Sequence, residues 1–165
     1  MPVPMPSVAQ VCELPSLMEK VIPPGWQDLN GHVNVRHYLE LYDAASWPML
    51  SALGVDERWF LEHRQGLFDL EHHLWYLDEL HVGDTVTVHS RMVDRTAKRY
   101  HGVMFIVNRT RGRLSSAFEY VSSGADLQTR RTAPLPAVFA AHLDRMIAAD
   151  AGLAWPAPVC GVMSA

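Results

Sequence analysis

Cysteine is scarce in this chain of 165 residues, where Cys12 and Cys160 are the two examples. Their wide separation matches neither a disulfide framework nor the close ligand spacing of a zinc site, so we expect no metal. The chain also lacks the GxGxxG motif that opens a dinucleotide-binding helix. These absences exclude a disulfide-stapled secreted domain, a zinc module and a Rossmann enzyme, and they favour a reducing compartment.

Long apolar runs are absent as well. No stretch approaches the roughly 20 apolar residues that a membrane-spanning helix requires. The first six residues, MPVPMP, contain neither the basic region nor the apolar core of a signal peptide. We therefore expect a cytoplasmic protein that does not associate with membranes.

Positive charge is in deficit. The chain has 14 Lys and Arg against 18 Asp and Glu, a formal net charge of −4, whereas a nucleic-acid-binding domain normally presents a basic face. Basic residues still cluster at Lys98-Arg99, at Arg130-Arg131 and between Arg109 and Arg113. These clusters could bind a small phosphorylated ligand, or they could be solvated turns.

The remaining composition is that of one globular domain. Hydrophobic residues make up 48% of the chain, and a domain of this size buries roughly 70% of its unfolded surface without a covalent staple. We expect a proline-rich extended tail over residues 1–15, a folded domain over residues 16–150 and a second tail over residues 151–165.

Apolar periodicity predicts an α+β domain. Apolar residues spaced by three and four predict a long amphipathic helix from Val35 to Leu53, with Gly54 as its C-cap and a kink or a new turn at Pro48. Alternating or β-rich segments predict strands at residues 17–22, 68–76, 85–94, 99–108 and 113–122. Shorter helices are expected at residues 56–63 and 136–149. Short loops between the later strands make them antiparallel neighbours, with the long helix packed on a curved sheet.

The most informative segment is residues 28–34, DLNGHVN, directly before the long helix. Asn-Gly reverses the chain at low cost, and Asn34 can accept hydrogen bonds from the first free helix amides. Asp28 is thereby predicted beside a helix N-terminus, which favours developing negative charge. The alternative is that Asp28 only shapes the turn.

Two motifs support a family resemblance. The element order and the match of Asp28, Gly31, His32 and Asn34 to an Asp followed by Gly-His-x-Asn resemble the hotdog fold of the 4-hydroxybenzoyl-CoA thioesterase-like superfamily. Residues 71–79, EHHLWYLDE, with Gly83 and Lys98-Arg99, resemble the thioesterase domain associated with carnitine dehydrogenases. The resemblance spans roughly residues 17–136. It implies an antiparallel five-stranded sheet wrapped on a long central helix.

The resemblance also implies site roles. Asp28 is expected to be the catalytic carboxylate, acting as nucleophile or as general base on water. Backbone N–H groups of Gly31, His32, Val33 and Asn34 are expected to stabilise the carbonyl oxygen as it becomes anionic. His32 can instead shape the turn, and Asn34 can serve only as a helix cap.

Glu71 and His73 are two residues apart on one predicted strand, so they project from the same face. They are predicted to orient water or to act as an acid–base pair beside Asp28. The competing interpretation is an ion pair at the surface or at an interface.

The function implied is an acyl-CoA thioesterase that hydrolyses a short or aromatic acyl-CoA, with a betainyl-type acyl group as one possibility, and uses no cofactor. Arg99, Arg130 and Arg131 are weaker predictions for binding the CoA phosphates. A homodimer or tetramer is expected, because hotdog sites generally lie between subunits. Alternatives are an acyl-ACP thioesterase, a hotdog hydratase or a protein that binds acyl thioesters without catalysis.

Overall fold

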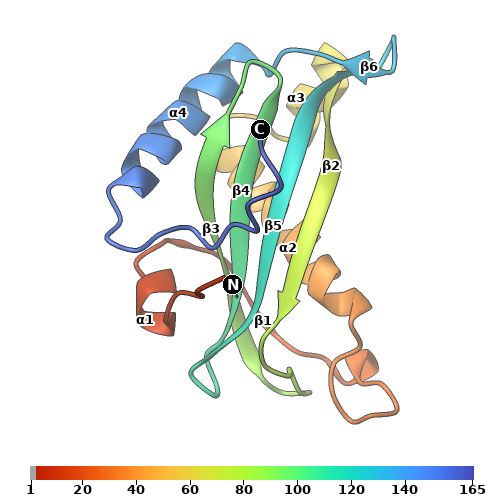
Figure 1. Ribbon diagram of the computed structural model, residues 1–165. Coiled ribbons are helices and arrows are strands. Elements are labelled where there is room, and N and C mark those ends of the chain that lie inside the picture. Colours follow the sequence, from red (N-terminus) through yellow and green to blue (C-terminus); the bar gives the residue numbers. More distant parts are fainter. Residues whose placement is uncertain (1–2) are drawn as a thin grey trace.

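The computed structural model describes residues 3–165 (Figure 1). The elements in chain order are α1 (Val8–Val11), β1 (Ser16–Val21), the 3-10 turn η1 (Pro24–Trp26), α2 (Arg36–Ala52), α3 (Glu57–His63), β2 (Gln65–Tyr76), β3 (Thr85–Arg95), β4 (Arg99–Asn108), β5 (Arg113–Asp126), β6 (Arg131–Thr132) and α4 (Ala137–Ala151). Among these described residues, no helix is both long and apolar enough to cross a membrane.

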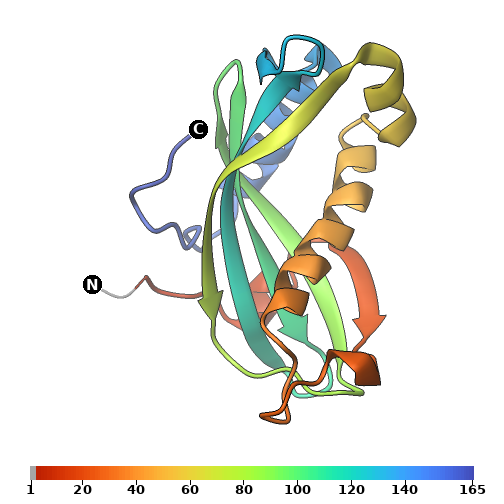
Figure 2. The same ribbon diagram turned by 90° about the vertical axis from the view of Figure 1, so that its right-hand side faces the viewer.

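One antiparallel sheet organises the molecule. Its strand order is β1-β3-β4-β5-β2, and the two-residue β6 pairs with β5. The sheet curls around α2, which lies along its concave face (Figure 2). The expected α+β fold, with five antiparallel strands wrapped on a long helix, is confirmed, and β6 is a small addition.

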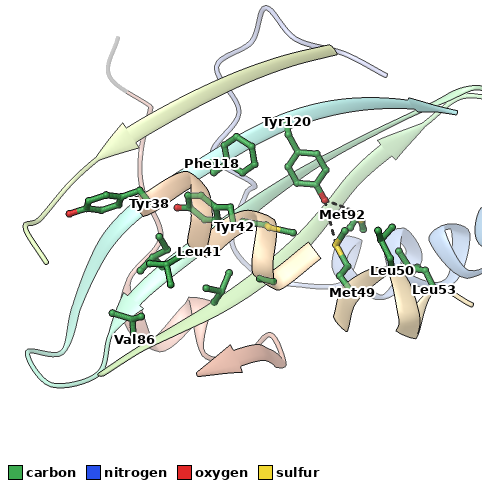
Figure 3. Packing of buried hydrophobic residues seen from close by; sticks show 14 of the residues in the cluster. Tyr38, Leu41, Tyr42, Met49, Leu50, Leu53, Val86, Met92, Phe118 and Tyr120 are labelled. Carbon is green, nitrogen blue, oxygen red and sulfur yellow. Dashed lines mark hydrogen bonds between the residues drawn. The ribbon is translucent and has the colours of Figure 1, made fainter. Parts of the chain in front are cut away.

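Helix α2 supplies one side of the main core. Tyr38, Leu41, Tyr42 and Met49 are all at most 5% exposed and face the sheet (Figure 3). Ala45 is 0% exposed and belongs to the same core cluster. The helix continues through Pro48 to Ala52, so the new turn expected at this proline does not occur. Pro48 cannot donate to the carbonyl of Ala44, but both residues are exposed, so water can hydrate that carbonyl.

The predicted helix end at Gly54 is confirmed. Gly54 has a φ of +83°, in the left-handed region that favours glycine, and the N–H of Val55 donates to the carbonyl of Leu50 at 3.1 Å. Helix α4 packs against this corner, where His142 contacts the carbonyl of Ala52 through Nδ1 at 3.1 Å.

The terminal segments differ from the expected tails. Residues 3–15 include the capped helix α1, and they pack together with the C-terminal segment on the convex face of the sheet, which faces the viewer in Figure 1. Val11, Leu14 and Trp155 are at most 4% exposed there and contact Phe105 and its neighbours. The segments fold because β4 and β5 are apolar on both faces, so the convex face also needs cover.

Strand β2 forms one edge of the sheet and contains a β-bulge. The register with β5 shifts between Asp69 and Glu71, which leaves Leu70 as the extra residue. The bulge moves Asp69 to the concave face, whereas simple alternation places it with Glu71 and His73. A period-two pattern cannot reveal a local bulge, so the face on which Asp69 lies depends on how β2 pairs with β5.

Candidate functional site

The loop of residues 28–34 forms the expected tight turn. The N–H of Asp28 donates to the carbonyl of His32 at 2.9 Å, and its carboxylate accepts the N–H of Asn30 at 2.8 Å. Gly31 has a φ of +85°, which glycine adopts without strain. The second carboxylate oxygen of Asp28 lies 3.6 Å from Nδ1 of His32, and the Asp28 side chain is 19% exposed. The turn therefore holds one carboxylate oxygen and leaves the other within reach of solvent.

The amides at the start of α2 are not all available. Those of Gly31, Val33 and Asn34 donate to the carbonyls of Asp28, Leu80 and Trp26 at 2.8–3.2 Å. This corrects the expectation that the whole Gly31–Asn34 turn offers donors, because one of the four amides is used within the turn and two are used by residues outside it. Within residues 3–165, the N–H of His32 has no hydrogen-bond partner, and neither has that of Val35.

Asn34 acts as a helix cap. Its side-chain oxygen accepts the N–H of Arg36 at 3.2 Å, as the sequence predicted. Behind it, the ring of Trp26 stacks on that of His37 with 4.5 Å between centroids and 4° between planes. Nδ1 of His37 also lies 2.7 Å from the carboxylate of Glu40. These contacts fix the first turn of α2 and, through it, the loop that holds Asp28.

A cleft of about 680 Å³ lies beside this turn. It is lined by Asp28, Asn30, His32, Val33, Val35, Tyr38, Tyr76, Leu77, Asp78 and Glu79. The loop and the start of α2 form one wall, and the end of β2 with the following residues forms the other. Asp28 therefore lines the same space as His32 and Val35, the two residues whose N–H groups are free.

Two tyrosines join the walls of the cleft. The rings of Tyr38 and Tyr76 meet edge to face with 5.1 Å between centroids. Burial raises the pKa of the Tyr38 hydroxyl, so this group stays protonated at neutral pH. Tyr76 is 53% exposed and forms the outer rim. The cleft thus combines aromatic surface with the carboxylates of Asp78 and Glu79.

Glu71 and His73 do share one face, but that face is the convex one. Glu71 pairs with Val121 and His73 with Glu119, and the His73 ring stacks on Trp75 at 4.1 Å between centroids. The cleft with Asp28 opens on the concave side, where Tyr76 meets α2. Within one chain, the structure therefore separates this pair from Asp28, because the sheet lies between them.

Sequence reasoning missed Asp69 and His72. Nε2 of His72 lies 3.0 Å from the carboxylate of Asp69, which also accepts a hydrogen bond from Ser122. The hydrogen bond from His72 lowers the pKa of Asp69. The two side chains line a second pocket of about 340 Å³ between α2 and β2, together with Tyr42 and Phe118. The sequence alone does not reveal this pair, because Asp69 reaches the face of His72 only through the bulge at Leu70.

The basic residues proposed for CoA binding lie away from Asp28. Arg99 begins β4, Arg130 is the last residue of the turn between β5 and β6, and Arg131 begins β6. Both segments are at the upper end of the molecule in Figure 1, whereas residues 28–34 are at the lower end. As for metals, the described part of the chain contains no group of three or more His, Cys, Asp or Glu side chains arranged to bind an ion.

Curated relatives share moderate identity with this chain. An L-carnitine dehydrogenase/betainyl-CoA thioesterase of Ruegeria pomeroyi is 29% identical over 140 residues, which are 84% of this chain and 28% of the relative. A betainyl-CoA thioesterase of Pseudomonas aeruginosa is 27% identical over 140 residues, 85% of this chain and 87% of the relative. The chain therefore spans little more than a quarter of the first relative and most of the second.

Solved structures show the same fold. A hypothetical protein of Staphylococcus aureus in complex with CoA superposes with a TM-score of 0.81 at 22% identity, covering 92% of this chain and 96% of that one. A 1,4-dihydroxy-2-naphthoyl-CoA thioesterase of Synechocystis superposes with a TM-score of 0.69 at 18% identity, covering 77% of this chain and 93% of that one. Residues 22–143 match the sequence profile of the thioesterase-like superfamily. This match covers most of the domain, including the Asp28 loop, α2 and strands β2 to β6, and the chain therefore belongs to the thioesterase-like superfamily.

Proposed function

We propose that this protein is an acyl-CoA thioesterase in which Asp28 is the catalytic carboxylate. The observation that carries the proposal is the position of Asp28 in a cleft whose lining also includes His32 and Val35, the residues with free N–H groups at the start of α2. A carboxylate next to unpaired helix-start amides matches the needs of acyl transfer, in which an electrophilic carbonyl carbon is attacked while its oxygen becomes negative.

The chemistry follows from these groups. The thioester carbonyl oxygen accepts hydrogen bonds from the N–H groups of His32 and Val35, and the dipole of α2 stabilises its developing charge. Asp28 attacks the carbonyl carbon or removes a proton from an attacking water. The new C–O bond forms first and gives a tetrahedral oxyanion, which expels the thiolate by breaking the C–S bond as the carbonyl re-forms. If Asp28 is the base, the proton that it took from water passes to the thiolate. If Asp28 is the nucleophile, a water molecule then hydrolyses the acyl–Asp28 anhydride to the free acid. The thiolate is a good leaving group because its parent pKa is about 8.5, so no strong general acid is required.

For the acyl group, we propose a short, positively charged group of the betainyl type. The relatives in Ruegeria pomeroyi and Pseudomonas aeruginosa are named for betainyl-CoA. In this chain, the ring of Tyr76 and the carboxylates of Asp78 and Glu79 border the cleft. Aromatic faces and carboxylates both attract a quaternary ammonium group. An aromatic acyl group is the second possibility, because Tyr38 and Tyr76 could pack against an aryl ring.

We also propose that two copies pair through β2. This edge strand has 12 residues, and those from Phe68 to His73 are exposed, with Phe68 at 47% and Leu70 at 48%. A long free edge with apolar side chains is a template for another strand. A two-fold axis perpendicular to the sheet makes the two β2 strands antiparallel and extends the sheet across both subunits. Both cysteines are free thiols, in keeping with the cytoplasmic location that we propose.

The catalytic proposal is tested by Asp28→Asn, with the exposed Asp94→Asn as the matched control. Free-thiol release should be measured with betainyl-CoA, aryl-CoA, straight-chain acyl-CoA and acyl-ACP. We expect Asp28→Asn to lower kcat by at least about 100-fold, with an unchanged circular dichroism spectrum, and Asp94→Asn to behave as wild type. Wild-type turnover in Asp28→Asn contradicts the assigned role.

The same panel separates the other functions. A preference for acyl-ACP indicates an acyl-ACP thioesterase, a hydrated acyl chain without thiol release indicates a hydratase, and tight binding without turnover indicates a non-catalytic binder. The dimer is tested by light scattering on Leu70→Lys, which should shift the protein toward monomer, against Val162→Lys as an exposed control.

A further inference from the structure

A buried carboxylate lies behind the cleft wall that follows β2. Asp84 is 5% exposed, and its N–H donates to the carbonyl of His81 at 3.1 Å, which closes a turn between β2 and β3. One carboxylate oxygen of Asp84 accepts two hydrogen bonds, from the N–H of His81 at 2.9 Å and from Nδ2 of Asn108 at 2.8 Å. Asp84 does not line the cleft, so it can act on the thioester site only through its neighbours.

Asn108 ties this turn to the one between β4 and β5. Asn108 is 0% exposed, and its Oδ1 accepts the N–H of Arg111 at 3.1 Å while its Nδ2 donates to Asp84. Both turns lie at the lower end of the molecule in Figure 1, as does the loop of residues 28–34. Because β4 lies in the middle of the sheet, Asn108 gives the Asp84 carboxylate a fixed support.

The peptide group between Leu80 and His81 joins Asp84 to the loop of residues 28–34. Its N–H, that of His81, donates to Asp84, and its carbonyl, that of Leu80, accepts the N–H of Val33 at 2.8 Å. A trans peptide group is planar, and its N–H and C=O point in opposite directions. Asp84 therefore orients this peptide plane, and the plane directs the Leu80 carbonyl at Val33.

A second peptide group continues the path to Asp28. Val33 shares this group with His32, whose carbonyl accepts the N–H of Asp28 at 2.9 Å. Three hydrogen bonds in series, at 2.9, 2.8 and 2.9 Å, thus connect the Asp84 carboxylate to the backbone of Asp28. Hydrogen bonds aligned in one direction polarise and strengthen one another, and an ionised acceptor at the end of the series forms the strongest type.

This series of hydrogen bonds fixes the geometry of the proposed reaction. It holds the backbone of Asp28, and it engages the N–H of Val33 while that of the neighbouring His32 stays free. If the series broke, Asp28 and the His32 amide would lose their fixed relative position. A misplacement of about 1 Å in such a site can lower the rate roughly 100-fold.

We propose that Asp84 is a positioning residue of the thioester site, which acts on Asp28 through two peptide groups and is itself supported by Asn108. The proposal rests on the thioesterase function and on the role of Asp28 proposed above. It adds to them a residue outside the cleft on which kcat depends. Because Asp84 acts by accepting hydrogen bonds at one oxygen, an amide oxygen in the same place should serve, whereas a methyl group should not.

The first test compares Asp84→Ala with the conservative Asp84→Asn. We expect Asp84→Ala to lower kcat for the best acyl-CoA by about tenfold or more, with KM changed less than about threefold, because misalignment affects the transition state more than binding. Asp84→Asn keeps an acceptor and should retain at least about half of the wild-type kcat. Wild-type kcat in Asp84→Ala overturns the proposal, and so does an equal loss in both variants, which would assign the effect to charge.

Asn108→Ala is the second variant, and it serves if Asp84→Ala does not fold. It removes the support of the carboxylate but leaves the bond from His81, so kcat should fall at least about threefold. Wild-type kcat in Asn108→Ala also overturns the proposal.

A control separates loss of position from loss of stability. Val103 is 0% exposed and packs under the terminal segments on the convex face, so Val103→Ala destabilises the domain without contact with the turn. Activity is measured at a temperature at which circular dichroism shows every variant to be folded. We expect Val103→Ala to retain the wild-type kcat. If it loses as much kcat as Asp84→Ala, the effect of Asp84 is general destabilisation and the proposal fails.

Hydrogen exchange measured by NMR tests the same path without turnover. In Asp84→Ala, the amides of Val33 and Asp28 should exchange at least about tenfold faster relative to those of β4, whereas Asp84→Asn and Val103→Ala should leave this ratio unchanged. If no thioester is hydrolysed but this difference is found, the positioning role stands and the catalytic assignment fails. If hydrolysis is confirmed but exchange at Val33 and Asp28 is unchanged in Asp84→Ala, the positioning role is refuted.

Discussion

The hydroxyl of Tyr38 accepts a hydrogen bond from the buried backbone N–H of Leu80 at 3.2 Å. This bond joins the first turn of α2 to the segment that follows β2. The next contact along that segment is between the carbonyl of Leu80 and the N–H of Val33, at 2.8 Å, within the loop that holds Asp28. One tyrosine hydroxyl thus connects the two walls of the cleft.

Tyr38→Phe should destabilise the protein by about 1–3 kcal/mol, because Leu80 is 0% exposed and its N–H would lose its acceptor without gaining water. Urea unfolding followed by tryptophan fluorescence measures the change. Tyr76→Phe is the matched control, since the Tyr76 side chain is 53% exposed, and it should alter stability by less than about 0.5 kcal/mol. Equal effects of the two substitutions would disprove this role of the Tyr38 hydroxyl.

Gly54→Ala should cost about 1–2 kcal/mol from the left-handed backbone alone. Its Cβ would also lie 3.1 Å from Cγ2 of Val138, which adds a steric cost. Gly83 has a φ of +86° with open space around it, and Gly25 has neither constraint. In thermal unfolding, the loss of melting temperature should therefore be largest for Gly54→Ala, smaller for Gly83→Ala and smallest for Gly25→Ala. Any other order contradicts the explanation.

Trp155→Ala tests whether the C-terminal segment belongs to the fold. Trp155 is 3% exposed, its ring lies 5.9 Å from that of Phe105, and the Arg91 guanidinium lies 4.2 Å from the Trp155 ring centroid. We expect a loss of about 3–5 kcal/mol in the free energy of unfolding. Val162→Ala, at a residue that is 82% exposed, should be neutral. A neutral Trp155→Ala would mean that the segment is dispensable.

Asp150 should make stability depend on pH. Burial raises the pKa of its carboxyl, which accepts the N–H of Met92 at 2.7 Å. A raised folded-state pKa contributes stability that is fully present below the unfolded value of about 3.9 and is lost as pH rises through the folded value. Asp150→Asn keeps an acceptor but cannot ionise. Urea unfolding between pH 3 and pH 7 should show the variant gaining stability relative to wild type as pH rises, and a constant difference would exclude this effect.

Local patterns predicted most of the elements because they depend on neighbouring residues. The expected strands at residues 85–94 and 99–108 correspond to Thr85–Arg95 and Arg99–Asn108 in the structure. The loop before α2 was also predictable, since the positive φ of Gly31 and the cap by Asn34 are short-range effects. The α+β class, the long helix and the position of Asp28 beside its N-terminus followed from the sequence in this way.

Features that depend on distant partners were not predictable. The bulge at Leu70 arises from the pairing of β2 with β5, and it decides that Asp69 rather than Glu71 lies on the concave face. Residues 3–15 and the C-terminal segment take up a defined structure because they pack on the apolar convex face of the sheet.

The sequence by itself determined the helix, the strands, the turn and the carboxylate at its start, because backbone preferences and apolar periodicity act over a few residues. Tertiary structure alone decided which amides remain free and on which side of the sheet each acid lies. The amides of Val33 and Asn34 are taken by Leu80 and Trp26, and those of His32 and Val35 are left. Hydrogen bonds between distant segments compete for the same donors, and that competition is settled only when the chain is folded.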